Sequence, residues 1–271
     1  MSIFKLYILC LLCFSTGYAQ NEYSFGVVAQ RSATLTANIW NPILTYVEHK
    51  TGIKLILSTA RTGDDSKLGT DKGTYDFVYS NQFFDAKPLL YIPILQPNSG
   101  TIRGQIVALE NSSIKTVKEL QNETIGFPSK SAFVGYAVPT DYLKKQNITF
   151  TEVFGGNQEG IMAQLKTGGI KAASVNSQLM KDYALRENFK YKVLWESEKF
   201  PDIPIAVHNR VPQDVVKKVQ DAIAGMTKDS EGIKILDEIA IITKQKPPLG
   251  FSKASLENYQ IYLNFYKQKD K

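Results

Sequence analysis

The chain has 271 residues, a formal net charge of +6, two cysteines and two histidines. Hydrophobic residues make up 43% and charged residues 21%, a composition typical of a folded globular protein and not of a disordered one. The basic residues are scattered along the chain instead of clustered, so the positive charge favours small anionic ligands and predicts no nucleic-acid partner.

The N-terminus has the pattern of a secretory signal. Lys5 precedes an apolar run at residues 6–14, and the small residues Gly17 and Ala19 precede Gln20. Such a run is too short to span a bilayer, which needs about 20 apolar residues. A buried N-terminal strand or helix is the alternative. We predict a signal peptide at residues 1–19 and a periplasmic mature protein.

Both cysteines, Cys10 and Cys13, lie inside the predicted signal. The mature protein then has no disulfide, no thiolate nucleophile and no cysteine metal site. Leu9 and Leu12 stand where a lipoprotein has a small residue before its lipidated cysteine. We therefore expect soluble export without a lipid anchor.

Two α/β blocks follow one another. In the first, residues 23–29, 53–57 and 76–79 read as strands, and residues 34–50 carry apolar side chains on one helical face until Gly52. This order predicts a parallel sheet with helices on both faces. In the second, we expect strands at 105–109, 125–127, 150–154, 172–175 and 191–195, and helices at 116–120, 158–166 and 132–145, with Pro139 kinking or dividing the last of these.

The C-terminal part predicts one more strand at 205–208 and helices at 213–227, 230–239 and 256–266. Glycine and proline punctuate the pattern at Arg103-Gly104 and at residues 201–204, which are natural crossover points. The fold class is therefore α/β with two lobes and two crossover segments. We expect lobe 1 at residues 20–104 and 205–271 and lobe 2 at residues 105–204.

Motifs of catalysis and metal binding are missing from the sequence. His49 and His208 lack metal-ligand spacing, and no nucleophile elbow, phosphate-binding loop or dinucleotide fingerprint is present. Asp64 and Asp65 are adjacent carboxylates expected to stay solvated in a polar loop. We predict no enzyme activity, no cofactor and no metal.

One turn between a strand and a helix carries two hydroxyls and a lysine: Ser129, Lys130 and Ser131, followed by Ala132. Free backbone N–H groups and the helix dipole attract an anion at such a helix start, and neighbouring hydroxyls add hydrogen bonds. This serine turn is the first candidate ligand site. The alternative is that Ser129 or Ser131 is only an N-cap.

Three other turns follow predicted strands, and open α/β sheets place ligands at such ends. Gln30 and Arg31 offer an amide and a guanidinium fork, although Arg31 could equally pair with a surface carboxylate. Tyr79, Ser80 and Asn81 end a short strand, where Tyr79 could instead belong to the core. Asn157 lies in a glycine-rich turn, with an N-cap as its alternative role. If the lobes face each other, these turns converge on one cleft.

These segments resemble the phosphate/phosphonate ABC-transporter substrate-binding family, the PhnD-like periplasmic proteins. The resemblance covers nearly the whole mature chain and depends on the order and spacing of short pieces. They are Phe25-Gly26-Val27, Gln30-Arg31-Ser32-Ala33, Trp40-Asn41-Pro42, Thr51-Gly52, Tyr75-Asp76-Phe77-Val78-Tyr79-Ser80-Asn81, Arg103-Gly104-Gln105-Ile106-Val107, Ile125-Gly126-Phe127-Pro128-Ser129, Ala132-Phe133 and Phe200-Pro201-Asp202-Ile203-Pro204.

The resemblance implies a bilobal type II periplasmic-binding fold. It also implies that Ser129, Lys130 and Ser131 hold the phosphoryl oxygens, with Tyr79 and Asn81 closing from the first lobe. The chain departs from the better-known phosphonate binders, which read Ser-Thr-Ser-Gly at the serine turn. It also has Gly156-Asn157-Gln158-Glu159 where relatives often have Ser-His-Asp-Ser, and Phe83-Phe84 where they often have Tyr and His. We therefore expect a retained anion site with altered recognition of the rest of the ligand.

Two functions are compatible with these features. The first is a monomeric periplasmic protein that captures phosphate, phosphite or a phosphonate-like anion for an inner-membrane ABC permease. The second is a periplasmic subunit that binds a different small anion and acts on a membrane signalling receptor. Both use the same open–closed equilibrium of the lobes.

Overall fold

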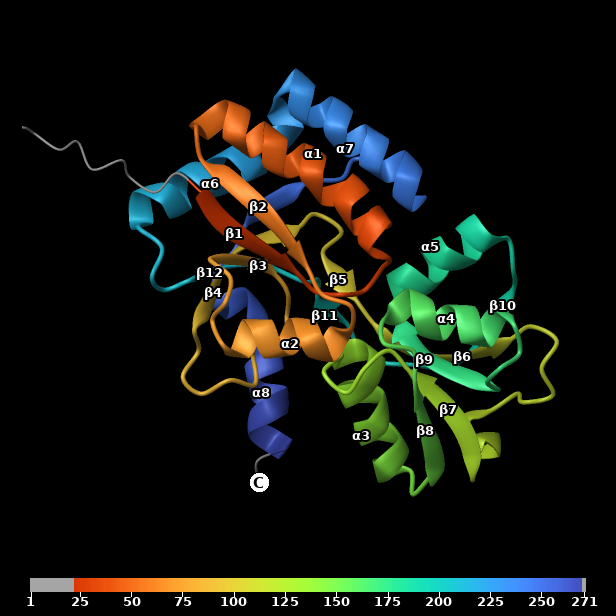
Figure 1. Ribbon diagram of the computed structural model, residues 1–271. Helices are drawn as coiled ribbons and strands as arrows, with labels where there is room; N and C mark the ends of the chain where they lie inside the picture. Colours follow the sequence, from red (N-terminus) through yellow and green to blue (C-terminus); the bar gives the residue numbers. More distant parts are fainter. Residues whose placement is uncertain (1–21, 270–271) are drawn as a thin grey trace, which may run out of the picture.

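The computed structural model describes residues 22–269, so the predicted signal peptide at residues 1–19 lies outside the described part. The protein consists of two α/β lobes side by side (Figure 1). Between them, β5 (Thr101–Ile102) pairs with β11 (Phe200–Pro201) in an antiparallel two-stranded ribbon. The chain passes from one lobe to the other through these two segments, close to the crossover points that the sequence predicted.

The first lobe contains a six-stranded sheet in the order β13-β4-β12-β3-β1-β2. Its strands are β1 (Glu22–Val27), β2 (Lys54–Thr59), β3 (Phe77–Tyr79), β4 (Tyr91–Pro97), β12 (Ile205–His208) and β13 (Phe251–Lys253). β1 is parallel to β2 and β3, whereas β12 is antiparallel to β3 and β4, and β13 to β4. The three strands of the predicted first block, β1, β2 and β3, are parallel as expected. The complete sheet is mixed, because the chain re-enters this lobe from the ribbon and β12 runs antiparallel to β3 and β4.

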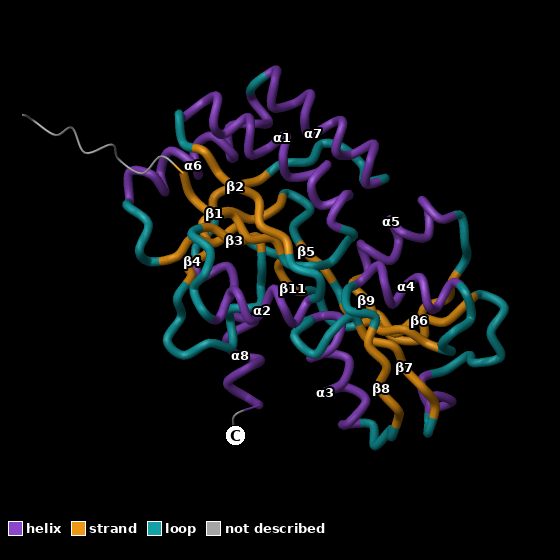
Figure 2. The backbone as a smooth tube through the Cα atoms, viewed as in Figure 1, coloured by secondary structure: helices purple, strands orange, loops and turns teal. Residues whose placement is uncertain are grey.

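Helices cover both faces of this sheet (Figures 1 and 2). One face carries α1 (Ala33–Thr51), α6 (Gln213–Gly225) and α7 (Ser230–Thr243), with η3 (Met226–Lys228) between the last two. The other carries α2 (Gly63–Asp71), η4 (Leu256–Tyr259) and α8 (Gln260–Lys269). The apolar face that the sequence predicted for this helix is buried and includes Ile43, Leu44 and Val47, and Trp40 is buried beside it.

The second lobe contains a five-stranded sheet in the order β10-β6-β9-β7-β8. Its strands are β6 (Gly104–Leu109), β7 (Glu123–Phe127), β8 (Phe150–Phe154), β9 (Ala172–Asn176) and β10 (Tyr191–Glu196). β7 is parallel to β8 and β9, and β6 is antiparallel to β9 and β10. Both lobes are therefore mixed sheets. These strands lie within residues 104–196, so β6 begins at Gly104, the last residue that we had placed in the first segment of lobe 1. The lobe boundaries stay a prediction.

Two helices pack on each face of the second sheet. The core on one face includes side chains of α4 (Gln158–Lys166) and α5 (Ser177–Glu187), and the core on the other includes side chains of η1 (Val117–Leu120) and α3 (Val138–Lys145). The predicted helix at 132–145 is divided as expected, into the π-helical turn η2 (Phe133–Ala137) and α3. Pro139, in the first turn of α3, has no N–H to donate to an earlier carbonyl.

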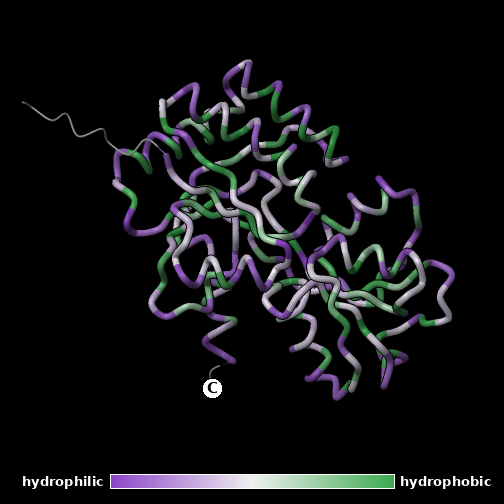
Figure 3. Tube along the Cα trace, in the orientation of Figure 1, coloured by the Kyte–Doolittle hydropathy of each residue, from purple (hydrophilic) through white to green (hydrophobic). Residues whose placement is uncertain are grey.

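Hydropathy follows this architecture. Apolar residues concentrate along the strands and on the helix sides that face them, while polar residues lie on outer loops and helix faces (Figure 3). Within residues 22–269, no helix is both apolar enough and long enough to cross a membrane.

Candidate functional site

The serine turn joins β7 to η2 and lies where the lobes meet. Ser129 is only 3% exposed, and its Oγ lies 3.0 Å from the Oγ of Ser131. The residue in the N-cap position of η2 is Ala132, and no side chain caps that helix. The two hydroxyls therefore do not act as N-caps here, and the first amides of η2 have no side-chain acceptor within residues 22–269.

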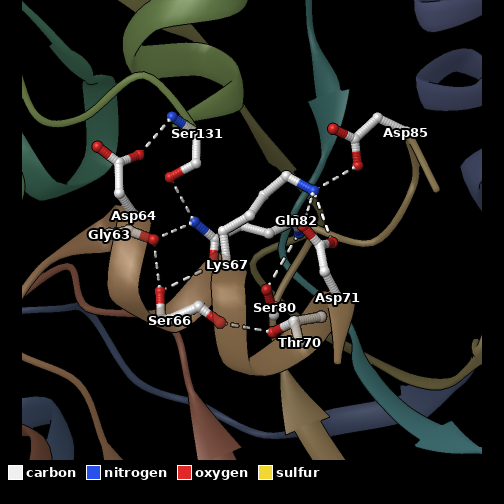
Figure 4. A network of polar contacts seen from close by, with 10 residues as sticks. All are labelled: Gly63, Asp64, Ser66, Lys67, Thr70, Asp71, Ser80, Gln82, Asp85 and Ser131. Atoms are coloured by element: carbon white, nitrogen blue, oxygen red, sulfur yellow. Dashed lines mark hydrogen bonds and ion pairs between the residues drawn. The ribbon is translucent and has the colours of Figure 1, made fainter. Parts of the chain in front are cut away.

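The first lobe contacts this turn directly (Figure 4). Gln82 donates from Nε2 to the Oγ of Ser131 (2.8 Å) and to the carbonyl of Gly63 (2.8 Å). Its Oε1 accepts a hydrogen bond from the Oγ of Ser66 (2.8 Å), which fixes the orientation of the amide. A neutral amide donor from one lobe thus reaches the hydroxyls of the other.

A carboxylate also reaches the serine turn. Asp64 Oδ1 accepts the backbone N–H of Ser131 at 3.0 Å. Asp64 and Asp65 are exposed, as predicted. The prediction that they lie in a loop was wrong. Both residues form the first turn of α2, where Thr62 caps the helix by accepting the N–H of Asp65 (3.1 Å). Acidic residues in a first helical turn are favoured by the helix dipole.

The approach of α2 to the serine turn requires a glycine. A Cβ on Gly63 would lie 2.4 Å from the Oγ and 3.0 Å from the Cβ of Ser129. The backbone N–H of Gly63 donates to the carbonyl of Gly156 in the second lobe (2.8 Å). The start of α2 therefore lies directly against the candidate anion site.

A cavity of about 30 Å³ lies at this contact between the lobes. Its walls include residues from both lobes, among them Gln30, Asn81, Gln82, Ser129, Ala132 and Gln158. Because both lobes enclose it, a ligand can reach this cavity only when the lobes move apart.

Further hydrogen bonds hold the lobes together beside the cavity. The N–H of Glu159 donates to the carbonyl of Gln30 (3.1 Å), and Glu159 Oε2 accepts the N–H of Ser32 (2.9 Å). Arg186 Nη2 donates to the other oxygen of Glu159 (2.6 Å) and steadies it. The structure is thus a closed arrangement of the two lobes.

The predicted residues Tyr79, Ser80 and Asn81 lie at the end of β3. Tyr79 packs against Trp40 with ring centroids 4.7 Å apart, and burial holds the pKa of Tyr79 well above its usual value. Ser80 and Asn81 are 2% and 6% exposed. Asn81 lines the cavity at the serine turn, whereas Tyr79 lines a second cavity next to it.

Two other predicted residues lie less centrally. Lys130 is exposed, and its Nζ lies 5.7 Å from the ring centroid of Phe154. Asn157 is the N-cap of α4, because its Oδ1 accepts the N–H of Gly160 (2.8 Å). Its side chain therefore fills the structural role that we had named as the alternative.

Arg31 pairs with a carboxylate, but not with one at the surface. Its Nη2 lies 3.5 Å from Oδ2 of Asp182, whose side chain is 1% exposed. Asp182 also accepts hydrogen bonds from the side-chain amides of Gln178 (2.7 Å) and Gln245 (2.9 Å). The sequence offered no signal for Asp182, because it lies inside α5 and meets Arg31 only through the contact of the two lobes.

No curated protein matches the sequence. A family model described as "ABC transporter, phosphonate, periplasmic substrate-binding protein" matches residues 25–259. Within residues 22–269, no group of three or more His, Asp or Glu side chains is placed to hold a metal ion.

Solved structures show the same fold. A binding protein of an ABC phosphonate transporter from Pseudomonas aeruginosa has a TM-score of 0.77 at 18% identity, over 93% of this chain and 88% of that one. A Prochlorococcus marinus protein in complex with methylphosphonate has a TM-score of 0.76 at 16% identity, over 93% and 99%. An alkanesulfonate-binding protein from Xanthomonas axonopodis pv. citri, bound to MOPS, has a TM-score of 0.58 at 15% identity, over 92% and 93%.

The mixed sheets of both lobes, the two crossover segments and these likenesses define a type II periplasmic-binding fold. Together with the match over residues 25–259, they show that the chain belongs to the family of phosphonate-binding periplasmic substrate-binding proteins of ABC transporters.

Proposed function

We propose that this protein captures a small oxyanion, namely phosphate, phosphite or a phosphonate-like anion, between its two lobes. The observation that supports this proposal is the pair of hydroxyls of Ser129, which is buried, and Ser131, which is half-buried and contacts the Gln82 amide of the opposite lobe. Hydroxyl and amide groups donate hydrogen bonds to an oxyanion without requiring a metal. We call Ser129, Ser131 and Gln82 the cradle.

The start of η2 adds to this chemistry. The first N–H groups of a helix have no acceptor within the helix, and the helix dipole places partial positive charge there. These donors lie directly after the serine turn, so an oxygen held by the hydroxyls comes close to them. The Prochlorococcus marinus relative bound to methylphosphonate shows that this fold accepts such an anion in another protein.

The family works with an ABC permease, and we propose that this chain delivers its ligand to such an importer as a monomer without a lipid anchor. Ligand binding stabilises the closed lobes by the difference between its affinities for the closed and the open state. The permease would then recognise the closed pair of lobes. Action on a membrane signalling receptor stays the alternative, because it uses the same closure.

Isothermal titration with methylphosphonate, phosphite, phosphate and sulfate tests the ligand class, and Ser129→Ala and Ser131→Ala test the cradle. A hydrogen bond to a charged group contributes about 1.5–3 kcal/mol, so each variant should bind its anion roughly 10- to 100-fold more weakly. The free energy of unfolding should change by about 1 kcal/mol or less, since neither hydroxyl caps a helix.

The matched control is Ser174→Ala in the same lobe. Ser174 is fully buried in β9, and its Oγ has no hydrogen-bond partner among the described residues. This variant should bind the anion like the wild type. Unchanged affinity in both cradle variants, or no binding of any of the four anions, would refute the proposed function.

A further inference from the structure

A second, larger cavity lies next to the cradle, lined mainly by the first lobe and also by Asn176, Gln178 and Leu179 of the second. Its volume is about 140 Å³, and it extends between α1, α7 and β13. Its apolar wall includes Trp40, Ile43, Leu236, Ile239, Leu249 and Phe251. It shares Val28, Gln30, Ile102 and Asn176 with the cavity at the cradle, so the two adjoin. We call this second cavity the chamber.

Arg31 supplies hydrogen-bond donors at the polar side of the chamber. Its side chain is 11% exposed. A guanidinium has five N–H donors. Within residues 22–269 its side chain makes one hydrogen bond, the long contact with Asp182 at 3.5 Å. The other N–H groups of Arg31 have no protein acceptor among these residues, so they can donate hydrogen bonds to an oxygen of a ligand.

The acidic side chains near Arg31 determine whether the ligand group in the chamber can carry a negative charge. Asp182 already opposes the charge of Arg31, and Asp202 also lines the chamber. Asp202 accepts hydrogen bonds from Ser99 Oγ (2.7 Å) and from the N–H of Ile203 (2.7 Å). Two carboxyl groups against one guanidinium disfavour a second negative charge on the ligand. Ligand sites are commonly apolar with a few placed polar groups, as here.

We propose that the chamber receives an uncharged, ring-sized substituent of the captured anion, so that the substrate class is organic phosphonates with such a tail. The size argument is that an engineered cavity of about 150 Å³ binds benzene. The adjoining walls place this tail beside an oxyanion in the cradle. This inference rests on the proposed function, since the anion group anchors the ligand.

Titration calorimetry with methylphosphonate, benzylphosphonate and 4-carboxybenzylphosphonate tests the proposal on the mature protein. Burial of the benzyl ring should make benzylphosphonate bind about tenfold or more tightly than methylphosphonate. The added carboxylate should remove most of that gain, because it meets Asp202 in the chamber wall while Arg31 is already paired with Asp182. Trp40 also lines the chamber, so in a Trp195→Phe background its fluorescence should respond to benzylphosphonate more than to methylphosphonate.

A larger side chain in the chamber wall should block the ring and so tests the same proposal by mutation. Leu249→Trp should reduce the preference for the benzyl compound to about twofold or less while methylphosphonate affinity stays unchanged. Ile39→Phe, on the α1 wall of the chamber, gives the same test should Leu249→Trp not fold. Leu256→Trp is the control, because Leu256 is also half-buried but packs in a different core cluster.

The outcomes separate the two proposals. If methylphosphonate binds and benzylphosphonate binds no more tightly, the chamber is not a substituent site and the proposed function stands. If the benzyl preference survives both filling variants, the ring binds elsewhere and this inference is wrong. If phosphate or phosphite binds but no phosphonate does, this inference is wrong and the proposed function stands. If none of these anions binds, both proposals fall.

Discussion

Asp64 is an unusual neighbour for an anion site, because its carboxylate accepts the N–H of Ser131 at 3.0 Å. A ligand oxygen in the cradle would compete for that same donor. The carboxylate therefore acts as an internal substitute for a ligand oxygen and also repels an incoming anion. Since Asp64 is exposed, solvent screens much of this repulsion.

We expect Asp64→Asn to bind the anion about three- to tenfold more tightly, because the amide removes the negative charge while its oxygen can still accept the Ser131 N–H. The gain should be larger at low than at high salt in calorimetric titrations. The control is Asp65→Asn, which removes an equal charge from the same turn without a bond to Ser131. Equal gains in both variants would mean that only long-range charge matters.

The environment of His208 predicts that the free energy of unfolding depends on pH. Its ring lies at the end of β12, edge-on to Tyr91 with centroids 5.1 Å apart. Burial, followed by the neighbouring Arg210 guanidinium, lowers the pKa of His208, while Asp76 opposes this shift. The unfolded chain therefore takes up the proton first as the pH falls.

The stability that comes from neutral His208 is thus present above the unfolded-state pKa of about 6.5 and is lost as the pH falls through the folded-state pKa. We expect His208→Gln to lose less stability than the wild type on acidification from about pH 7 to pH 5. Urea unfolding at several pH values measures this, with His49→Gln as an exposed-histidine control. Parallel losses in wild type and His208→Gln would contradict the assignment.

The sequence could predict those parts of the candidate site that come from one continuous segment, but not the contacts between the two lobes. A strand, a proline and two serines before a helix indicate donors at one strand end, and Ser129 and Ser131 do lie at the contact of the lobes. Gln82 and Asp64 could not be found in this way, because their contacts span 49 and 67 residues and form only when the lobes meet. No local pattern encodes such a contact.

Among the elements, those with a strong apolar period were predicted well, and α1 and α4 begin and end close to the expected residues. α2 was missed because it has few apolar residues. This helix is stabilised by the Thr62 cap and by Lys67, which forms ion pairs with Asp71 and Asp85. β4 was missed because it contains prolines, and its pairing with β12 is irregular beside Pro93.

The helix α8 connects the lobes through aromatic packing. Phe133 follows the serine turn and is 2% exposed. Its ring centroid lies 4.3 Å from that of Tyr262 and 5.0 Å from that of Phe265, both in α8, and 4.9 Å from that of Phe200 in β11. The packing therefore joins the turn of the second lobe to the last helix of the first.

We expect Phe133→Ala to lower the free energy of unfolding by about 3–5 kcal/mol, the usual cost of removing a buried phenyl ring. Anion affinity should also fall, because the serine turn loses its support, and this second effect distinguishes Phe133 from other core residues. Denaturant melts and titrations measure the two quantities. The control Phe189→Ala lies in another core cluster of the second lobe and should change stability without changing affinity.

The whole molecule is held closed by direct contacts between the lobes. They include Gly63 to Gly156, Glu159 to Gln30, and the cradle contact of Gln82 with Ser131. On the other side, only the two segments of the β5–β11 ribbon carry the chain across. Because residues of both lobes enclose the cavity at the cradle, binding must begin from a more open arrangement.

The affinity for an anion then depends on the equilibrium between open and closed lobes, and Gly63 lets us change this equilibrium without removing a donor. A methyl group on Gly63 would lie 2.4 Å from the Oγ and 3.0 Å from the Cβ of Ser129, which is too close for the present arrangement. Gly63→Ala should therefore shift the lobes toward the open state.

Small-angle scattering should show a larger radius of gyration for ligand-free Gly63→Ala than for the wild type, and titration should show about tenfold weaker anion binding, since each factor of ten corresponds to about 1.4 kcal/mol of disfavoured closure. Gly225→Ala is the matched control, because a Cβ there has no heavy atom within 4 Å. It should leave both quantities unchanged. A compact Gly63→Ala protein with normal affinity would show that Ser129 simply rotates away, and that contact between α2 and the serine turn does not control closure.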